Sequence, residues 1–477
     1  MGAKAWKYTD ASQPDFPAHF EIKKKAVLQV TDIKNNNNKY YALELHSGTL
    51  AGGLERFRVF THYGRTDDLE TNPDAGMKES RYFDTFPEAL NEYEKLYRAK
   101  TGPSKGYKEV ALASSKIGSA MARGQSSGEV DAKTLEKMKG PKGETPAAPK
   151  SSLSAPLQDL VSYIYSEATD ALTSTVAAKI TANGIETPLG VLTVGQIEKG
   201  EAILDELYEH FKAGTATRKM LEDASGDFYS AIPHRLGRTR EAIAAAVIDS
   251  LEQFDQKQET LQLMKDMLAV NGEHGSVLFD AQVDQKYRAL GCELAEVNRD
   301  SKDFKTLADY VHKSQVKHKN VKVQSIYTIR RPAEQSAFRT DIGNERQLFH
   351  GSRIKNWVGI LSRGILMPKI VVSMGVNRTD AGWLGNGMYF GDAACTASFY
   401  TTPGKKQTRF MAIARVALGK TMDFTKITYG LNEPPPGFQS THGVRRSLLR
   451  RSDFDDDEYV IYDPRQQRLE YLVEFKA

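Results

Sequence analysis

The chain has 477 residues, of which 40% are hydrophobic and 26% are charged. This balance is typical of a soluble globular protein with about three domains. The apolar runs are far shorter than the ~20 residues of a membrane span, and residues 1–6 lack the apolar core of a signal peptide. Two cysteines, Cys292 and Cys395, are too few for a disulfide framework or a zinc finger. We therefore expect an intracellular protein without a membrane segment or a structural metal.

The first 110 residues predict a small α+β domain. Short apolar runs between residues 26 and 60 indicate strands, and residues 86–97 indicate a helix with Thr85 as its N-cap. Residues 1–150 carry 24 Lys and Arg against 20 Asp and Glu, which accounts for the whole net charge of +4. Such an excess favours a surface that faces nucleic acid. On charge alone, an ordinary solvated surface explains it as well.

Three further segments follow. Residues 111–155 are rich in Pro, Gly, Ser and Lys with almost no large apolar side chain, which predicts a flexible linker. Residues 156–272 have apolar side chains at helical spacing, as at Leu157 and Leu160, which predicts an all-α helical bundle. Residues 273–477 return to strand-like runs interrupted by short helices, so a mainly antiparallel β domain is expected. The predicted fold class is multidomain α+β.

Three short segments of the last domain each place one chemically capable side chain beside an apolar, β-prone run. They are residues 348–352 with His350, residues 387–392 with Tyr389, and residues 457–463 with Glu458. In order and in flanking residues they resemble the His-Tyr-Glu signature of the poly(ADP-ribose) polymerases. Further landmarks of that family's catalytic domain are matched by residues 350–364, 417–420, 436–438 and 442–444. The resemblance implies an enzyme that transfers ADP-ribose from NAD to an acceptor and releases nicotinamide.

The resemblance also implies roles for the acid and the aromatic residues. Glu458 would stabilise the cationic, oxocarbenium-like ribose and would orient or deprotonate the incoming hydroxyl. Tyr389 and Tyr400 would hold the nicotinamide ring between their faces. Taken without the resemblance, the acidic run 455–458 would be a solvated loop and the two tyrosines would be core residues of a β domain.

The remaining contacts to NAD would come from the segment that starts at His350. His350 would hydrogen-bond the adenosine-side ribose, and Ser352 would add a contact to a ribose or a phosphate. Gly351 would offer its backbone N–H and C=O to the carboxamide, because glycine lets a ligand approach the backbone closely. A lone histidine at a strand end is more often structural, and only the His-Gly-Ser context favours the functional role.

Three positions depart from the family's pattern. Ala397 stands where a serine usually donates to the carboxamide oxygen, and Ser398 is the candidate to replace it. Thr396 takes the place of a common lysine, and Leu366 that of an expected arginine. A carboxamide oxygen can accept two hydrogen bonds, and Ser398 is a poor substitute if the stretch is helical. We therefore expect nicotinamide-like ligands to bind more weakly than in relatives.

The two earlier domains resemble the family as well. Residues 20–108 are similar to its Trp-Gly-Arg domain, with Tyr63 in place of the signature tryptophan. Tyr63 would stack on a sugar or base at a DNA end, and Arg65 would contact a phosphate or another domain. A spacer without DNA affinity is the alternative. Residues 187–197 and 228–234 resemble the regulatory helical domain, which in relatives shields the NAD cleft until a signal loosens it; a plain packing scaffold is the alternative.

These resemblances imply a NAD-dependent poly(ADP-ribose) polymerase that DNA breaks activate and that acts in DNA repair. Its partners would be DNA ends or nicks, protein acceptors including the chain itself, and a protein that directs acceptor choice. We expect it in the nucleus if the source is eukaryotic and in the cytoplasm if it is bacterial. A transferase of single ADP-ribose units is one alternative, favoured by the three departures. A DNA-end adaptor that binds NAD without turnover is another, disfavoured because all three anchors are present.

Overall fold

The computed structural model describes residues 3–35, 37–72, 74–120, 151–181, 184–234, 236, 239–271, 283–315, 318–367 and 382–477. The chain divides into two compact units. The first comprises residues 1–150 and 172–268, and the second comprises residues 151–171 and 269–477. Within the described ranges, no helix has the length and apolar character needed to cross a membrane.

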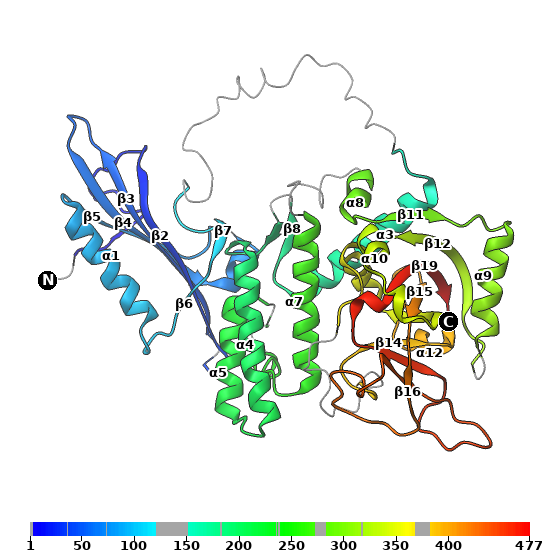
Figure 1. The fold of residues 1–477 in the computed structure, drawn as a ribbon. Coiled ribbons are helices and arrows are strands. Elements are labelled where there is room, and N and C mark those ends of the chain that lie inside the picture. The colour runs from blue at the N-terminus through cyan, green and yellow to red at the C-terminus, as the bar shows by residue number, and fades with distance from the viewer. Residues whose placement is uncertain are drawn as a thin grey trace, which may run out of the picture. The chain divides into compact units, whose positions relative to one another are not determined.

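The first unit begins with a six-stranded antiparallel sheet in the order β1-β5-β4-β3-β2-β6 (Figure 1). Helix α1 (Phe86–Thr101) packs on one face of it, and the Thr85 side chain caps the helix by accepting a hydrogen bond from the backbone N–H of Glu88. This arrangement confirms the predicted small α+β domain. The strands are β1 (Trp6–Lys7), β2 (Glu21–Asp32), β3 (Asn37–Thr49), β4 (Glu55–Arg65), β5 (Met77–Phe83) and β6 (Lys108–Glu109).

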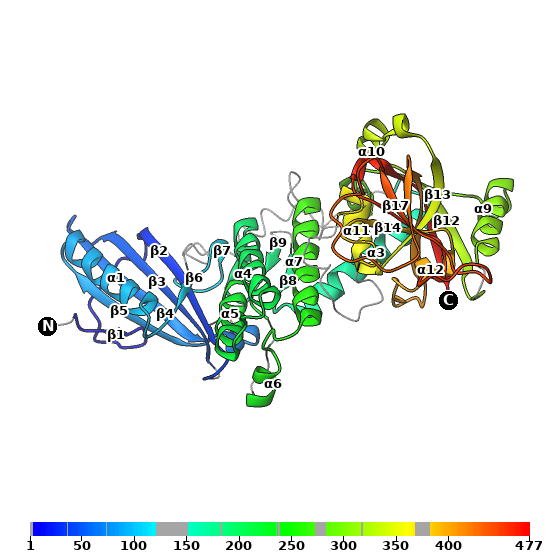
Figure 2. The same ribbon diagram turned by 60° about the horizontal axis from the view of Figure 1, so that its bottom comes forward.

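The helical part of the first unit also contains a small sheet, which the all-α prediction lacked. Its order is β7-β10-β9-β8. The sequence forms a hairpin here because the Thr187 hydroxyl donates to the Gly190 carbonyl at 2.9 Å and closes the turn between β9 and β10. The elements are α4 (Val194–Lys212), α5 (Arg218–Ala231), α6 (Arg240–Ala244), α7 (Leu251–Asn271), β7 (Leu112–Ser115), β8 (Lys179–Thr181), β9 (Gly184–Glu186) and β10 (Gly190–Leu192) (Figure 2).

Part of the predicted linker, residues 111–155, is ordered. Strand β7 pairs with β10, and Ile117 is buried in a cluster with Leu189. The segment needs no core of its own because it adds an edge strand to a sheet formed by later residues. Residues 121–150 lie outside the described residues. Helix α3 (Ala155–Thr175) begins where the predicted linker ends.

The second unit is built on a nine-stranded sheet in the order β11-β12-β19-β15-β13-β14-β18-β17-β16. Every neighbouring pair is antiparallel except β16 and β17, which agrees with the predicted mainly antiparallel domain. The strands are β11 (Glu293–Glu296), β12 (Lys322–Arg330), β13 (Glu345–Ser352), β14 (Met388–Gly391), β15 (Arg409–Ala417), β16 (Thr421–Phe424), β17 (Ser440–Gly443), β18 (Glu458–Ile461) and β19 (Gln467–Lys476). The helices are α8 (Val283–Ala289), α9 (Lys302–Lys313), α10 (Pro332–Ala337), α11 (Trp357–Arg363) and α12 (Ala394–Ser398).

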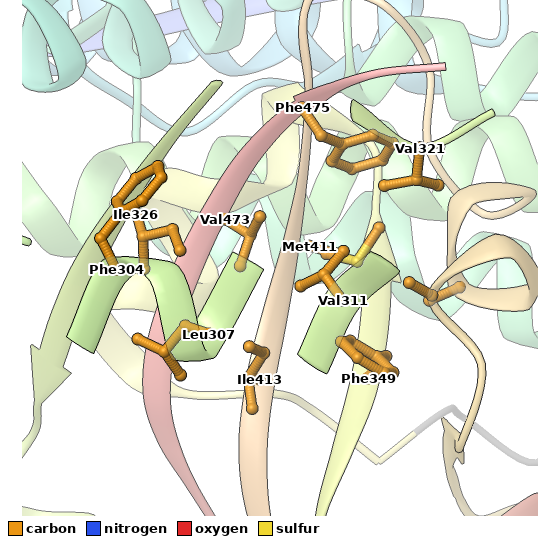
Figure 3. Packing of buried hydrophobic residues seen from close by; sticks show 12 residues of the cluster. Phe304, Leu307, Val311, Val321, Ile326, Phe349, Met411, Ile413, Val473 and Phe475 are labelled. Atoms are coloured by element: carbon orange, nitrogen blue, oxygen red, sulfur yellow. The ribbon is translucent and has the colours of Figure 1, made fainter. Parts of the chain in front are cut away.

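Helix α9 packs against the middle strands of this sheet (Figure 3). Its Phe304, Leu307 and Val311 recur at helical spacing and form one apolar face. That face contacts side chains of β12, β13, β15 and β19, including the fully buried Phe349. Phe349 directly precedes His350, so this core fixes the position of the first predicted site residue.

Candidate active site

The three anchor segments lie on neighbouring strands of the nine-stranded sheet. In the register, Gly391 of β14 faces Phe349 of β13 on one side and Glu458 of β18 on the other. A cavity of about 70 Å³ opens at this point. Its lining residues are Phe349, His350, Gly351, Tyr389, Phe390, Gly391, Thr396, Ala397, Tyr400 and Glu458. The structure thus brings together the predicted histidine, glycine, glutamate and both tyrosines.

The hydrogen bonds of His350 define its tautomer. Its Nδ1 lies 3.0 Å from the carbonyl oxygen of Tyr389. Because a carbonyl only accepts hydrogen bonds, Nδ1 carries the proton and donates. The surrounding protein desolvates the ring and lowers the pKa of His350, which the bond to Tyr389 counters in part. The neutral ring therefore keeps Nε2 as an acceptor for a ligand hydroxyl.

Glu458 is a buried acid, only 9% exposed. Within the described residues its carboxylate has no hydrogen-bond or ion-pair partner. Burial, together with the charges of Asp456 and Asp455, raises the pKa of Glu458 to about 7. A carboxyl group with such a pKa exchanges its proton readily near neutral pH, as general acid–base chemistry requires.

Tyr389 and Tyr400 border the same cavity. The hydroxyl of Tyr389 donates to the carbonyl of Gly385 at 2.7 Å and accepts from the backbone N–H of Leu384 at 2.8 Å. Burial raises the pKa of Tyr389 far above its ordinary value, so the phenol stays neutral. Two bonds to the backbone hold the ring, whose face can therefore serve as a fixed stacking surface.

Gly351 sits where no side chain fits. A Cβ atom there would lie 1.9 Å from the carbonyl oxygen of Ala397 in α12. Packing of α12 against β13 thus requires glycine, in addition to the ligand approach that sequence analysis considered. Ser352 does not line the cavity, and its Oγ accepts a hydrogen bond from Asn356 Nδ2 at 3.3 Å.

Ser398 was predicted to contact the ligand, but its side chain is directed away from the cavity. Its hydroxyl donates to the carbonyl of Cys395 at 2.7 Å, within α12. Each residue of an α-helix turns the side chain by ~100°, so Ala397 and Thr396 line the cavity while Ser398 is buried behind them. Leu366 is exposed and also lies outside the lining.

A charged network next to Glu458 was not among the site residues predicted from the sequence. Arg445 donates to both carboxylate oxygens of Asp392, at 2.8 and 2.9 Å. His442 pairs with Asp457 at 2.9 Å and stacks on the ring of Tyr459, with centroids 4.4 Å apart. The available signal was the acidic run 455–457, because several adjacent carboxylates entering a buried strand need cations nearby.

The first unit presents an aromatic and basic patch around Tyr63. Its ring stacks on Tyr41 with centroids 5.5 Å apart, and its hydroxyl donates to Glu79 at 3.1 Å. The ammonium group of Lys100 lies 4.2 Å from the Tyr41 ring and 5.7 Å from the Tyr63 ring. Arg65 pairs with Asp67 at 3.1 Å. Among the residues that the structure describes, no group of three His, Cys, Asp or Glu side chains could hold a metal ion.

Comparison with known families matches three models along the chain. They are the WGR domain at residues 24–113, the poly(ADP-ribose) polymerase regulatory domain at residues 151–287, and the poly(ADP-ribose) polymerase catalytic domain at residues 301–477. The last of these contains every residue that lines the cavity.

Several curated proteins are similar over most of the chain. The protein mono-ADP-ribosyltransferase PARP4 of Homo sapiens is 30% identical over 97% of this chain and 24% of its own length. The corresponding protein of Mus musculus is 33% identical over 68% of this chain and 16% of its own length. Poly [ADP-ribose] polymerase 2 of Homo sapiens is 26% identical over 94% of this chain and 78% of its own length. The chain thus spans about a quarter or less of the two PARP4 proteins. With three domain models in the same order and an intact His-Tyr-Glu cavity, the chain belongs to the poly(ADP-ribose) polymerase family.

Proposed function

We propose that the chain transfers ADP-ribose from NAD to protein acceptors and releases nicotinamide. The observation that carries this proposal is the single cavity lined by His350, Tyr389 and Glu458. A neutral histidine acceptor, a fixed aromatic face and a buried carboxylate are the groups that the two ribose rings and the nicotinamide of NAD would require. NAD serves as the substrate, and we propose no metal.

Glu458 supplies the chemistry of transfer. When the bond between nicotinamide and ribose breaks, the ribose develops positive charge, and a nearby carboxylate stabilises it in a site shielded from water. The same carboxylate accepts a proton from the attacking hydroxyl of the acceptor. Tyr389 and Tyr400 hold the leaving ring. The catalytic set is therefore Glu458, His350 and Tyr389, and Gly351 and Ser352 belong to the binding segment.

We propose that the product is a polymer, with single ADP-ribose units as the second candidate. The second candidate is favoured by Thr396, Ala397 and Leu366. It is also favoured by the similarity to the human and mouse PARP4 proteins, which are named as mono-ADP-ribosyltransferases. Incubation of the pure protein with labelled NAD separates the cases. A ladder supports the polymerase and a single band supports the mono-transferase, whereas no label would leave only a DNA-binding adaptor.

DNA ends or nicks are the proposed activator. We propose that residues 1–110 bind them through Tyr63, Arg65 and Lys100, which combine a stacking surface with positive charge. Residues 156–272 would restrain the catalytic domain, residues 273–477, until DNA binds. The protein would then work in DNA repair, in the nucleus of a eukaryote or the cytoplasm of a bacterium, with itself among its acceptors and with a partner that directs acceptor choice.

Nicked DNA tests this regulation. We expect it to raise turnover, and added salt to reduce the effect because phosphate contacts release counterions. Replacing Tyr63 by Ala should weaken activation while leaving DNA-independent turnover unchanged. The matched control is Tyr8→Ala, an exposed tyrosine of the same unit. Equal activation of both variants would contradict the assignment of Tyr63.

A further inference from the structure

Arg445 connects three acidic side chains around the start of β18. Its Nη2 donates to Asp392 at 2.8 and 2.9 Å and lies 3.3 Å from Oδ1 of Asp456. Its backbone N–H donates to the carboxylate of Asp457 at 2.8 Å. One cation therefore compensates two carboxylates and fixes the loop that precedes Glu458.

The two acids that Arg445 compensates lie beside the strands that carry the cavity, and Asp456 acts directly on Glu458. Asp392 follows Gly391, which faces Glu458 in the register of β14 and β18. Asp456 is two residues before Glu458 and 5% exposed, and it accepts a hydrogen bond from the hydroxyl of Thr396, which lines the cavity. The charge of Asp456 raises the pKa of Glu458. Because Asp456 is buried, its charge acts on Glu458 through protein rather than through water.

The other charged groups near Glu458 are already paired or neutral. Asp457 pairs with His442. Asp455, whose charge also raises the pKa of Glu458, pairs with Arg446 in an exposed ion pair. The titratable groups that share the cavity with Glu458 are His350, Tyr389 and Tyr400; the pKa shifts of His350 and Tyr389 keep these two side chains uncharged at neutral pH.

We propose that Arg445 is a positioning residue that favours the ionised form of the Glu458 carboxylate near neutral pH and holds it in place by compensating Asp456. Like charges disfavour ionisation of a buried carboxyl group. Asp392 shows the effect of the cation, since burial raises the pKa of Asp392, Arg445 lowers it, and the net pKa is about 6. This inference rests on the proposed ADP-ribosyl transfer for its functional meaning.

The test is the pH profile of transfer from labelled NAD, with Arg445→Gln compared with the unchanged protein. Without the cation, we expect the acid limb of kcat to shift upward by about one pH unit. If the pKa of Glu458 moves from about 7 to about 8, kcat falls roughly fivefold at pH 7 and recovers above pH 9. KM for NAD should stay unchanged. Arg445→Lys should restore most of the profile.

Two further variants separate an electrostatic role from a structural one. Arg451→Gln removes the same charge from an exposed position of the same loop and should leave the profile unchanged. Adding Asp456→Asn to Arg445→Gln removes the uncompensated acid and keeps a hydrogen-bond acceptor for Thr396. The acid limb of the kcat profile should then return to its position in the unchanged protein. An equal loss at every pH, with no rescue by the second change, would overturn the proposal.

Titration of Glu458 through protein stability tests the effect of Arg445 without relying on ADP-ribosyl transfer. The unfolding temperature of each protein is compared with that of its Glu458→Gln variant across pH. The loss of stability caused by Glu458 should reach its full value near pH 7 in the unchanged protein. With Arg445→Gln it should reach its full value at a pH about one unit higher. If this shift appears although no label is ever transferred, the proposed function fails and the inference about Arg445 stands. If it is absent, the inference fails.

Discussion

Two buried glutamates, one in each unit, have opposite surroundings. Glu44 in β3 accepts hydrogen bonds from His46 at 2.6 Å and from the N–H and hydroxyl of Ser119 at 2.9 and 2.6 Å. Burial alone would raise the pKa of Glu44, but these bonds outweigh it and lower the pKa. Glu458 has no such partner within the described residues, and its pKa rises to about 7.

The difference shows how burial of an acid can serve structure or chemistry. A carboxylate whose oxygens are satisfied by donors is locked in its charged form and fastens distant segments together. Here Glu44 fastens residue 119 to the six-stranded sheet. A carboxylate left without donors costs stability, which a protein keeps only where the group has another use. The absence of donors around Glu458 among the described residues supports its proposed role in transfer.

The largest expected effect comes from Glu458→Gln. This change keeps the size of the side chain and removes its charge, so transfer and elongation should fall by about 10²–10³-fold. Binding of a NAD analogue, measured by calorimetry, should persist because the aromatic faces and His350 remain. Normal elongation by this variant would mean that another acid of the run 455–458 carries the role.

Glu44→Gln is the matched substitution in the other unit. Here we expect no loss of turnover per folded molecule but a loss of stability of about 3 kcal/mol, because one partner of a buried charged network is removed. Denaturant unfolding followed by circular dichroism gives the value. A stable but inactive Glu44→Gln protein would contradict the contrast between the two sites.

The two glutamates should also respond oppositely to pH. The folded-state pKa of Glu458 lies above its ordinary value of 4.5, so the folded protein binds the extra proton and stability falls as pH rises from 4.5 to about 7. The full deficit is about 3 kcal/mol at ~1.36 kcal/mol per pH unit. The pKa of Glu44 is lowered, so its stabilisation is present above pH 4.5 and is lost as pH falls through its folded pKa. Unfolding temperatures of the two Gln variants between pH 3 and 8 measure both slopes.

The anchors of the site could be predicted from the family resemblance, because each motif that carries it is local in the sequence. His350, Tyr389 and Glu458 each stand in a short β-prone segment, and strand formation brings those segments to one sheet. The supporting contacts could not be predicted, because their partners are far apart in sequence: Glu44 meets Ser119 across 75 positions, and Arg445 meets Asp392 across 53.

The orientation of Ser398 and the hairpin before α4 could not be predicted either. Both depend on individual hydrogen bonds that the residue types alone do not determine. α12 has only five residues, and its hydrogen bonds decide which side chain faces the cavity. The strands β8, β9 and β10 have three residues each, and the turn formed by Thr187 selects a hairpin over continued helix. Elements this short have little periodicity to detect.

The smallest expected effect concerns Ala397, which lines the cavity of Glu458 where a hydroxyl donor would complete the binding of a carboxamide. Ser398 cannot replace that donor, since its own hydroxyl is engaged with Cys395. Ala397→Ser should therefore tighten a benzamide-type inhibitor by about 0.5–1.5 kcal/mol, which is up to roughly tenfold in affinity. Titration of one inhibitor against both proteins measures this gain, with Ala394→Ser, a buried α12 position outside the lining, as the control. Unchanged or weaker binding by Ala397→Ser would show that the carboxamide oxygen already has a second hydrogen-bond donor. The cavity around Glu458 would then supply every donor that its ligand needs, as the surrounding protein does for Glu44.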